Sequence, residues 1–213
     1  MNDSPFAPDD FYRLDDSPDP LFYAEPRKVV HLDAAACAAV SDFLHDAVPA
    51  DAEVLDLLSS WRSHWPPELS KRRLVGLGLN AEEMADNPDL DDFVVHDVNA
   101  MPKLPFDDAS FDAAVLVVSI QYLTRPVAVF REVGRVLRAG GLFAVLYSNR
   151  MFPTKAVAIW RRLGDRQHAD LIAAYFEAAG GFADLEARNC SPPFPPGSDP
   201  LNVVMARKAL SVD

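Results

Sequence analysis

The sequence has few cysteines, and the two present, Cys37 and Cys190, lie far apart in unrelated contexts. Such a pair predicts no disulfide framework and indicates a reducing compartment. Long apolar runs are missing as well: no stretch reaches the length that spans a bilayer, and no apolar segment follows a basic start. We therefore expect a cytoplasmic protein without a membrane partner.

Basic charge is also scarce. Twenty Lys and Arg residues stand against 32 Asp and Glu residues, which gives a net charge of −12 at pH 7. Nucleic-acid backbones and anionic membranes repel acidic proteins, so neither is expected as the main partner. The densest basic stretch, residues 71–73, is expected to be a solvated face before a strand.

The five histidines are scattered, without the spacing typical of metal ligands. No Ser-His-Asp or Cys-His set for nucleophilic catalysis can be assembled from the sequence either. We therefore expect no metal site and no covalent nucleophile.

The residues that are present alternate between strand and helix patterns in a chain of 213 residues, a length that suits one well-buried core. We predict strands at residues 54–58, 74–77, 93–96, 111–118, 142–147, 182–187 and 202–206. We predict a helix capped by Asp33 and closed by Pro49, a short helix beginning at residues 66–69, and helices at 81–85, 127–137, 155–163 and 168–179. Gly140 and Gly141 are expected to end the helix at 127–137 in a left-handed cap. The alternation predicts a mostly parallel sheet with helices on both faces.

The first 32 residues differ from the rest. They are irregular and begin with a segment rich in Asp, Pro and Ser, which indicates an extended arm. Scattered aromatic residues imply that this arm lies on the protein, with Phe22, Tyr23 and Arg27 as candidate contacts. We expect residues 1–32 to form a partial lid over the carboxyl edge of the sheet, and residues 33–213 to form one α/β domain.

The segment Glu53–His64 is the predicted centre of the protein. A short apolar strand passes Asp56 and opens into a serine-containing loop, and in open α/β folds ligands bind at that carboxyl edge. Asp56 either binds a ligand amine through water or caps the turn. His64 either acts as a general base or holds the loop by bonding to its backbone.

Two segments carry a family resemblance. Residues 104–112 read Leu-Pro-Phe-Asp-Asp-Ala-Ser-Phe-Asp, and residues 130–141 read Phe-Arg-Glu-Val-Gly-Arg-Val-Leu-Arg-Ala-Gly-Gly. They resemble the approach to the fourth strand, and the helix and double glycine before the fifth, of class I S-adenosylmethionine-dependent methyltransferases of the type 11 subgroup. The resemblance covers about residues 53–147. It implies a Rossmann-like methyltransferase fold: about seven strands, mostly parallel, with an antiparallel C-terminal edge hairpin.

The resemblance implies S-adenosylmethionine as cofactor and assigns its contacts. Asp56 matches the acid of the first motif, but Leu58, Ser60 and Arg62 stand where the family has glycines, which allow close backbone approach. We expect the loop of residues 59–64 still to line the pocket. Ser59 and Ser60 would meet the amino-acid part of the cofactor, and Trp61 would cover apolar surface. The alternative is that Trp61 fills the cofactor cavity and closes it.

The other two cofactor motifs follow the second and third strands. Gly78 replaces the family's ribose-binding acid, and Asn80 is the nearby group that could hydrogen-bond instead. Asp97 and Val98 resemble the adenine-binding pair. We expect an open pocket that touches Ser60, Asn80, Asp97 and Ser119.

The predicted reaction is methyl transfer to a small-molecule acceptor that the sequence does not name. In-line positioning suffices for this chemistry, so no strict triad is required. Candidate catalytic residues are His64, Tyr122 and Asn149, with Arg150 completing the wall. The rival hypothesis is a methyltransferase-like binding or regulatory protein that has lost catalysis, which the missing glycines favour. An NAD-dependent enzyme is poorly supported because its glycine fingerprint is absent. The oligomeric state stays open.

Overall fold

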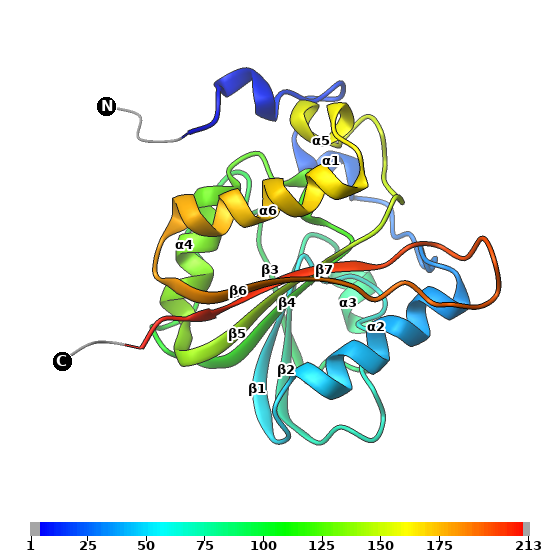
Figure 1. The fold of residues 1–213 in the computed structure, drawn as a ribbon, viewed down its shortest axis with the longest axis vertical. Helices are drawn as coiled ribbons and strands as arrows, with labels where there is room; N and C mark the ends of the chain where they lie inside the picture. Colours follow the sequence, from blue (N-terminus) through cyan, green and yellow to red (C-terminus); the bar gives the residue numbers. More distant parts are fainter. Residues whose placement is uncertain (1–4, 211–213) are drawn as a thin grey trace.

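The computed structural model describes residues 5–210, and within them the strands form one sheet of seven in the order β3-β2-β1-β4-β5-β7-β6 (Figure 1). The strands from β1 to β5 run parallel, and β7 is antiparallel to both β5 and β6. The expected α/β, Rossmann-like architecture with an antiparallel C-terminal edge is therefore confirmed. The bounds are β1 (Ala52–Leu57), β2 (Lys71–Gly78), β3 (Asp92–Val95), β4 (Phe111–Val117), β5 (Leu137–Tyr147), β6 (Phe182–Asn189) and β7 (Asn202–Lys208).

Helices cover both faces of the sheet (Figure 1). They are η1 (Pro8–Phe11), α1 (Asp19–Phe22), α2 (Ala34–Ala47), α3 (Ala81–Ala85), η2 (Ile120–Tyr122), α4 (Pro126–Val136), α5 (Ala158–Arg162) and α6 (Asp165–Ala179). One hydrophobic core lies between the sheet and α4, α5 and α6; a second lies between the sheet and α2. Successive residues of β4 alternate between the two cores, because side chains along a strand point to opposite faces. This central strand is therefore apolar from Ala113 to Val117.

Helix α2 shows how local sequence sets an element boundary. The carboxylate of Asp33 accepts a hydrogen bond from the backbone N–H of Ala36 at 2.8 Å, as the predicted N-cap requires. Ala36, Val40 and Leu44 lie on one side of the helix at helical spacing and are buried. The predicted helix is thus present with its cap.

Two predictions about helices were wrong. No helix forms at residues 66–69, where Leu69 donates its N–H to the carbonyl of Pro66 in a turn and packs with Trp65 in the second core. Pro67 has no N–H and disfavours helical geometry in the residue before it. Gly140 does not cap α4, which ends at Val136 as the chain becomes extended. Gly140 instead has φ of +76° inside β5, where the β4–β5 register shifts.

The arm is more ordered than expected, because it contains η1 and α1 rather than an extended chain alone. Tyr12 and Asp15 make backbone hydrogen bonds to Ala158 and Thr154, which follow β5 in the chain. The rings of Phe6 and Phe11 pack on Tyr175 of α6. The arm therefore lies on the protein as predicted. Residues 1–4 of the predicted lid lie outside the described residues.

No helix among residues 5–210 combines the length and the apolar composition that a membrane crossing needs.

Candidate functional site

A cavity of about 590 Å³ lies at the carboxyl ends of β1, β2 and β4. Its walls come from six segments: the arm between Asp19 and Leu32, the loop after β1, the end of β2 with the start of α3, the loop after β3, the loop after β4, and residues 149–152 after β5. Every candidate site residue except Trp61 lines it, namely Asp56, Ser59, Ser60, His64, Asn80, Asp97, Val98, Ser119, Tyr122 and Asn149. Strand order alone brings these residues together, as in other open α/β sheets.

Backbone strain is concentrated at this cavity. Leu58, His64 and Val118 line it and have positive φ angles of 59°, 55° and 46°. Side chains other than glycine rarely adopt this conformation, and a β-branched residue such as Val118 is an outlier there. Leu58, one of the positions where the sequence resemblance leads us to expect glycine, therefore has a left-handed backbone conformation. Strain of this kind is held in place at functional sites by the surrounding structure.

Asp56 both lines the cavity and holds the turn after β1. Its Oδ2 accepts hydrogen bonds from the hydroxyls of Ser59 and Ser63, each at 2.6 Å. Burial raises the pKa of Asp56 to about 6, and the two hydroxyl hydrogen bonds oppose that rise. Both alternatives considered for Asp56 thus fit its position: it caps the turn and it faces the cavity.

The loop after β1 lies directly on the end of β2. The N–H of Ser59 donates to the carbonyl of Leu77 at 2.9 Å. A Cβ atom on Gly78 would lie 2.2 Å from the carbonyl oxygen of Ser59. No side chain fits at Gly78 unless this loop moves, so this structure leaves no room for an acid at the end of β2.

Asn80, expected to replace that acid, and Ser60, expected to meet the amino-acid part of the cofactor, already have side-chain hydrogen bonds. Asn80 caps α3 by accepting from the N–H of Glu83 at 3.0 Å, and its amide nitrogen donates to the carbonyls of Tyr23 and Ala24. The hydroxyl of Ser60 donates to Glu83 at 2.5 Å. Within residues 5–210 the backbone N–H of Ser60 has no acceptor, so it is a donor that this loop can offer to a ligand.

Trp61 is the one candidate that the structure places outside the cavity wall. The guanidinium of Arg62 lies 3.7 Å from the centre of its ring. The alternative in which Trp61 fills the cavity and closes it is therefore wrong. The buried tryptophan of this segment is Trp65, whose Nε1 donates to the carbonyl of Leu69 at 3.0 Å in the second core.

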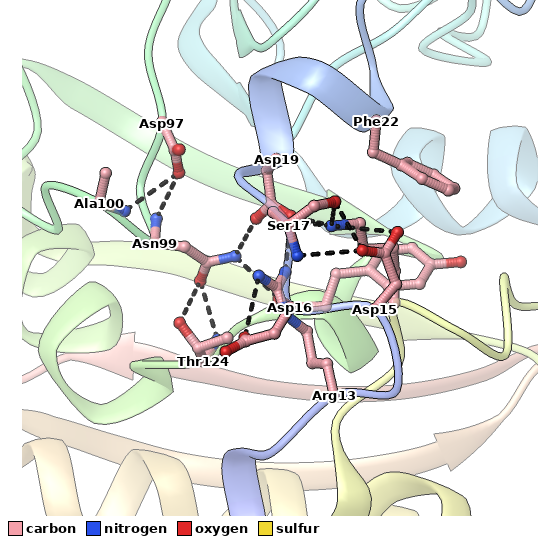
Figure 2. A network of polar contacts seen from close by, with 12 residues as sticks. Arg13, Asp15, Asp16, Ser17, Asp19, Phe22, Asp97, Asn99, Ala100 and Thr124 are labelled. Atoms are coloured by element: carbon pink, nitrogen blue, oxygen red, sulfur yellow. Dashed lines mark hydrogen bonds and ion pairs between the residues drawn. The ribbon is translucent and has the colours of Figure 1, made fainter.

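The loop after β3 presents one unused carboxylate oxygen. Oδ1 of Asp97 accepts from the N–H groups of Asn99 and Ala100, at 2.9 and 3.1 Å (Figure 2). In the described part of the chain, Oδ2 of Asp97 and the N–H of Val98 have no hydrogen-bond partner. Together they offer one acceptor and one donor to the cavity.

The candidate catalytic residues lie at different depths. Burial lowers the pKa of His64, so its imidazole is neutral at physiological pH. The hydroxyl oxygen of Tyr122 accepts from the N–H of Phe152 at 2.7 Å. Asn149 is exposed, whereas Ser119 is half-buried and donates to the carbonyl of Val117 at 2.9 Å.

The arm meets the loop after β3 through a buried polar network (Figure 2). Asp19 pairs with Arg13 at 2.6 Å and with Lys155 at 3.3 Å, and its Oδ2 accepts from the amide of Asn99 at 2.8 Å. The same amide donates to the carbonyl of Tyr122 at 2.9 Å. The network ties the arm to both the third-motif loop and the loop after β4.

Among the residues of this wall that the sequence did not indicate are Asp19, His31 and Glu83. Glu83 had a usable signal, because an acid three residues after an N-cap Asn is typical of a capping box. In the structure Glu83 is buried and bonds to Arg27 of the arm and to Ser60. Asp19 and His31 had no such signal, since their position depends on how the arm folds back.

No group of three or more His, Cys, Asp or Glu side chains within residues 5–210 is arranged to hold a metal ion.

Comparison with known proteins gives a family match and many structural neighbours. Residues 68–145 match the type 11 family described as a methyltransferase domain. No curated protein sequence matches the chain. Among solved structures, the [4+2]-cyclase SpnF aligns with a TM-score of 0.61 at 17% identity, over 88% of this chain and 86% of that chain. An S-adenosylmethionine-dependent methyltransferase from Mesorhizobium loti aligns with a TM-score of 0.58 at 19% identity, over 82% and 100%.

A third neighbour is the 1,6-didemethyltoxoflavin-N1-methyltransferase of Burkholderia thailandensis, solved with its substrate and S-adenosylhomocysteine. It aligns with a TM-score of 0.60 at 18% identity, over 83% of this chain and 80% of that chain. At these identities the alignments show the fold alone. Because the neighbours include a cyclase as well as methyltransferases, the fold does not fix the reaction.

Proposed function

Because residues 68–145 match the type 11 methyltransferase domain, we propose that the chain is a class I methyltransferase that transfers a methyl group from S-adenosylmethionine to a small-molecule acceptor. The observation that supports this proposal most is the shared cavity. The loops after β1, β3 and β4 and the end of β2 all face one space of about 590 Å³, within the usual range for small-molecule and cofactor sites.

The free polar groups of the cavity suit the cofactor. Asp97 Oδ2 and the N–H of Val98 would pair with the adenine edge, and the N–H of Ser60 with the cofactor's amino-acid part. Asp56 faces the same space and would attract the ammonium group. The ribose would lie against Gly78, and the buried Glu83 is the acid that would lie near it in place of the missing strand-end acid. Ser119 lines the wall after β4.

S-adenosylmethionine would supply an electrophilic methyl group. The protein's own part is then to position the acceptor, exclude water and, where the acceptor is protonated, accept its proton. His64 is neutral and lines the cavity, so it is the group we assign to that last role. The arm, with residues up to Leu32 in the wall, would act as the partial lid. A covered site of this size suits a small acceptor.

Isothermal titration with S-adenosylhomocysteine and S-adenosylmethionine tests the proposal. We expect binding to the wild type, and at least tenfold weaker binding to Asp97→Asn. This variant keeps the Oδ1 acceptor of the turn but replaces Oδ2 with an NH₂ group that cannot accept from adenine. Asp107→Asn, at an exposed aspartate outside the cavity, is the matched control and should bind as the wild type does. Absence of heat with both ligands at millimolar concentration would favour the non-catalytic rival.

A further inference from the structure

The half of the cavity away from the first motif is aromatic. Tyr23 and Phe22 of the arm, Tyr122 after β4 and Phe152 after β5 form a connected group of rings. Ring centres lie 4.9 Å apart for Phe22 and Tyr23, 5.5 Å for Phe22 and Phe152, and 6.0 Å for Tyr122 and Phe152, the last pair being stacked. Tyr23, Tyr122 and Phe152 line the cavity. This wall suits a flat, apolar ligand.

Two tyrosine hydroxyls in this wall can donate a hydrogen bond. The oxygen of Tyr122 accepts from the N–H of Phe152, with the side chain of Gln121 also beside this hydroxyl, and its proton is the group that can point to a ligand. The hydroxyl of Tyr23 has no hydrogen-bond partner within residues 5–210. Burial raises the pKa of both groups, and the pKa of Tyr23 rises further because Tyr122 and Asp19 are close. Both hydroxyls therefore remain protonated and act as donors.

A cation without a counter-ion lies beside them. The guanidinium of Arg27 lies over the ring of Phe22 at 4.4 Å and 5.5 Å from that of Phe152, and its Nη2 donates to the carbonyl of Phe22 at 2.8 Å. Its Nη1 is buried without a hydrogen-bond partner. Across the described residues this side chain forms no ion pair. Leaving a charge partly buried and unpaired is unfavourable, so an anion nearby would be bound.

The acids in the same wall form no ion pair with Arg27. Asp19 is paired with Arg13 and Lys155, two cations that offset its charge. Glu83 accepts from the hydroxyl of Ser60 and from the backbone N–H of Arg27, so both of its oxygens are engaged. His31 adds no negative charge. The wall thus presents two hydroxyl donors and a guanidinium that forms no ion pair within the described residues.

We propose that Tyr23, Tyr122 and Arg27 bind a carboxylate on a small aromatic acceptor, with the hydroxyls as hydrogen-bond donors and Arg27 as the neutralising charge. The carboxylate is an anchor that fixes the ring against Phe152, and it is not the atom that receives the methyl group. The claim that this ligand is the methyl acceptor rests on the proposed function. The claim that the site binds a carboxylate is independent of the proposed function.

Benzoate and benzamide are the probes, because they share a shape and differ in charge. Titration into the protein saturated with S-adenosylhomocysteine should show benzoate binding at least tenfold more tightly than benzamide. Tyr23→Phe and Arg27→Met should each reduce benzoate affinity at least tenfold and leave benzamide unchanged, while Arg27→Lys should retain part of the preference. Equal binding of the two probes by the wild type, or unchanged benzoate affinity in both Tyr23→Phe and Arg27→Met, overturns the proposal.

Two matched controls come from the same arm. Tyr12→Phe removes a hydroxyl from an exposed tyrosine, and Lys28→Met removes an exposed cation that pairs with Glu82 and Asp86; neither residue lines the cavity. Both should discriminate between the probes as the wild type does. If either loses the preference, the effect comes from general disturbance of the arm and the assignment to Tyr23 and Arg27 fails.

A second titration tests whether the bound carboxylate belongs to the acceptor or to the cofactor. S-adenosylhomocysteine carries a carboxylate, and 5′-methylthioadenosine lacks it. We expect Arg27→Met to bind both nucleosides within threefold of the wild type. A tenfold loss confined to S-adenosylhomocysteine would assign the anion site to the cofactor and overturn the acceptor assignment. A wild type that prefers benzoate, measured without nucleoside, but binds neither nucleoside would retain the anion site and refute the proposed function.

Discussion

Asp56 faces the cavity, where its charge would attract a ligand amine, but the buried charge lowers the stability of the folded protein. It is buried at the end of β1 with only two hydroxyl partners, and burial raises its pKa from 3.8 to about 6. The folded state therefore holds this proton more tightly than the unfolded chain does. The resulting stabilisation is complete below about pH 3.8 and is lost as the pH rises to about 6, a change of about 3 kcal/mol.

The Asp56→Asn variant should remove this penalty. Its amide oxygen can still accept from Ser59 and Ser63, and it carries no charge to desolvate. Urea denaturation should show the variant more stable than the wild type at pH 7 to 8, by up to about 3 kcal/mol, with the difference shrinking towards pH 4. A difference that stays constant across this range would show that Asp56 does not titrate as its burial requires.

At Gly78 the available space excludes any side chain. A Cβ atom there would lie 2.2 Å from the carbonyl oxygen of Ser59 and 3.1 Å from the sulfur of Met84. Because the first contact is with backbone, Gly78→Ala must displace the loop after β1. We expect a loss of about 1 to 3 kcal/mol in the free energy of unfolding, and weaker binding of S-adenosylhomocysteine.

The matched control for this change is Gly164→Ala. The nearest atom to a Cβ at Gly164 is 3.9 Å away, an ordinary contact, and the position precedes α6 on the surface. This variant should lose no more than about 1 kcal/mol and should leave nucleoside binding unchanged. If both variants are equally stable and bind equally well, the loop is not seated on Gly78 as described.

Among the structural elements, the N-terminal arm is held to the segment that follows β5 through Lys155. Its side chain is fully buried, donates to the carbonyl of Ser17 at 2.6 Å, and lies 3.3 Å from Asp19. Removing one partner of a buried ion pair leaves the other charge uncompensated, which typically destabilises by about 3 to 5 kcal/mol.

Lys155→Met should therefore loosen the arm while the sheet keeps its protection. Hydrogen exchange should become faster at the N–H groups of Asp15 and Tyr23, whose acceptors are Thr154 and Asp19. Lys28→Met removes an exposed pair, worth no more than about 1 kcal/mol, and should change exchange little. Equal exchange in Lys155→Met and the wild type would mean that the arm is held by its apolar contacts alone.

The sequence predicted those elements whose cause is local. Helix α3 was predicted at its observed bounds, Ala81–Ala85, because the cap Asn80 is adjacent in the chain. The strand ends at Asp56 and Asp97 placed both residues at the cavity for the same reason. The short helices of the arm were missed, since α1 is fixed by ion pairs from Asp19 to Arg13 and to the distant Lys155. Trp61 was predicted in the wall because spacing does not show which way a loop side chain turns.

In the whole molecule, the cavity is assembled from segments spread between Asp19 and Phe152, at the carboxyl ends of most of the parallel strands. The arm brings Asp19, Tyr23 and Arg27 over the carboxyl edge, and the loops after β1, β3 and β4 supply the opposite side. The central claim is that this one space holds S-adenosylmethionine, with its adenine at Asp97 and its amino-acid part at Ser60.

A crystal structure of the protein grown with millimolar S-adenosylhomocysteine tests that claim most directly. The account predicts the adenine amino group within hydrogen-bond distance of Asp97 Oδ2, a ring nitrogen facing the N–H of Val98, and the amino-acid part at Ser60 and Asp56. A cavity that remains empty at this concentration, or a nucleoside bound anywhere else on the protein, would contradict it.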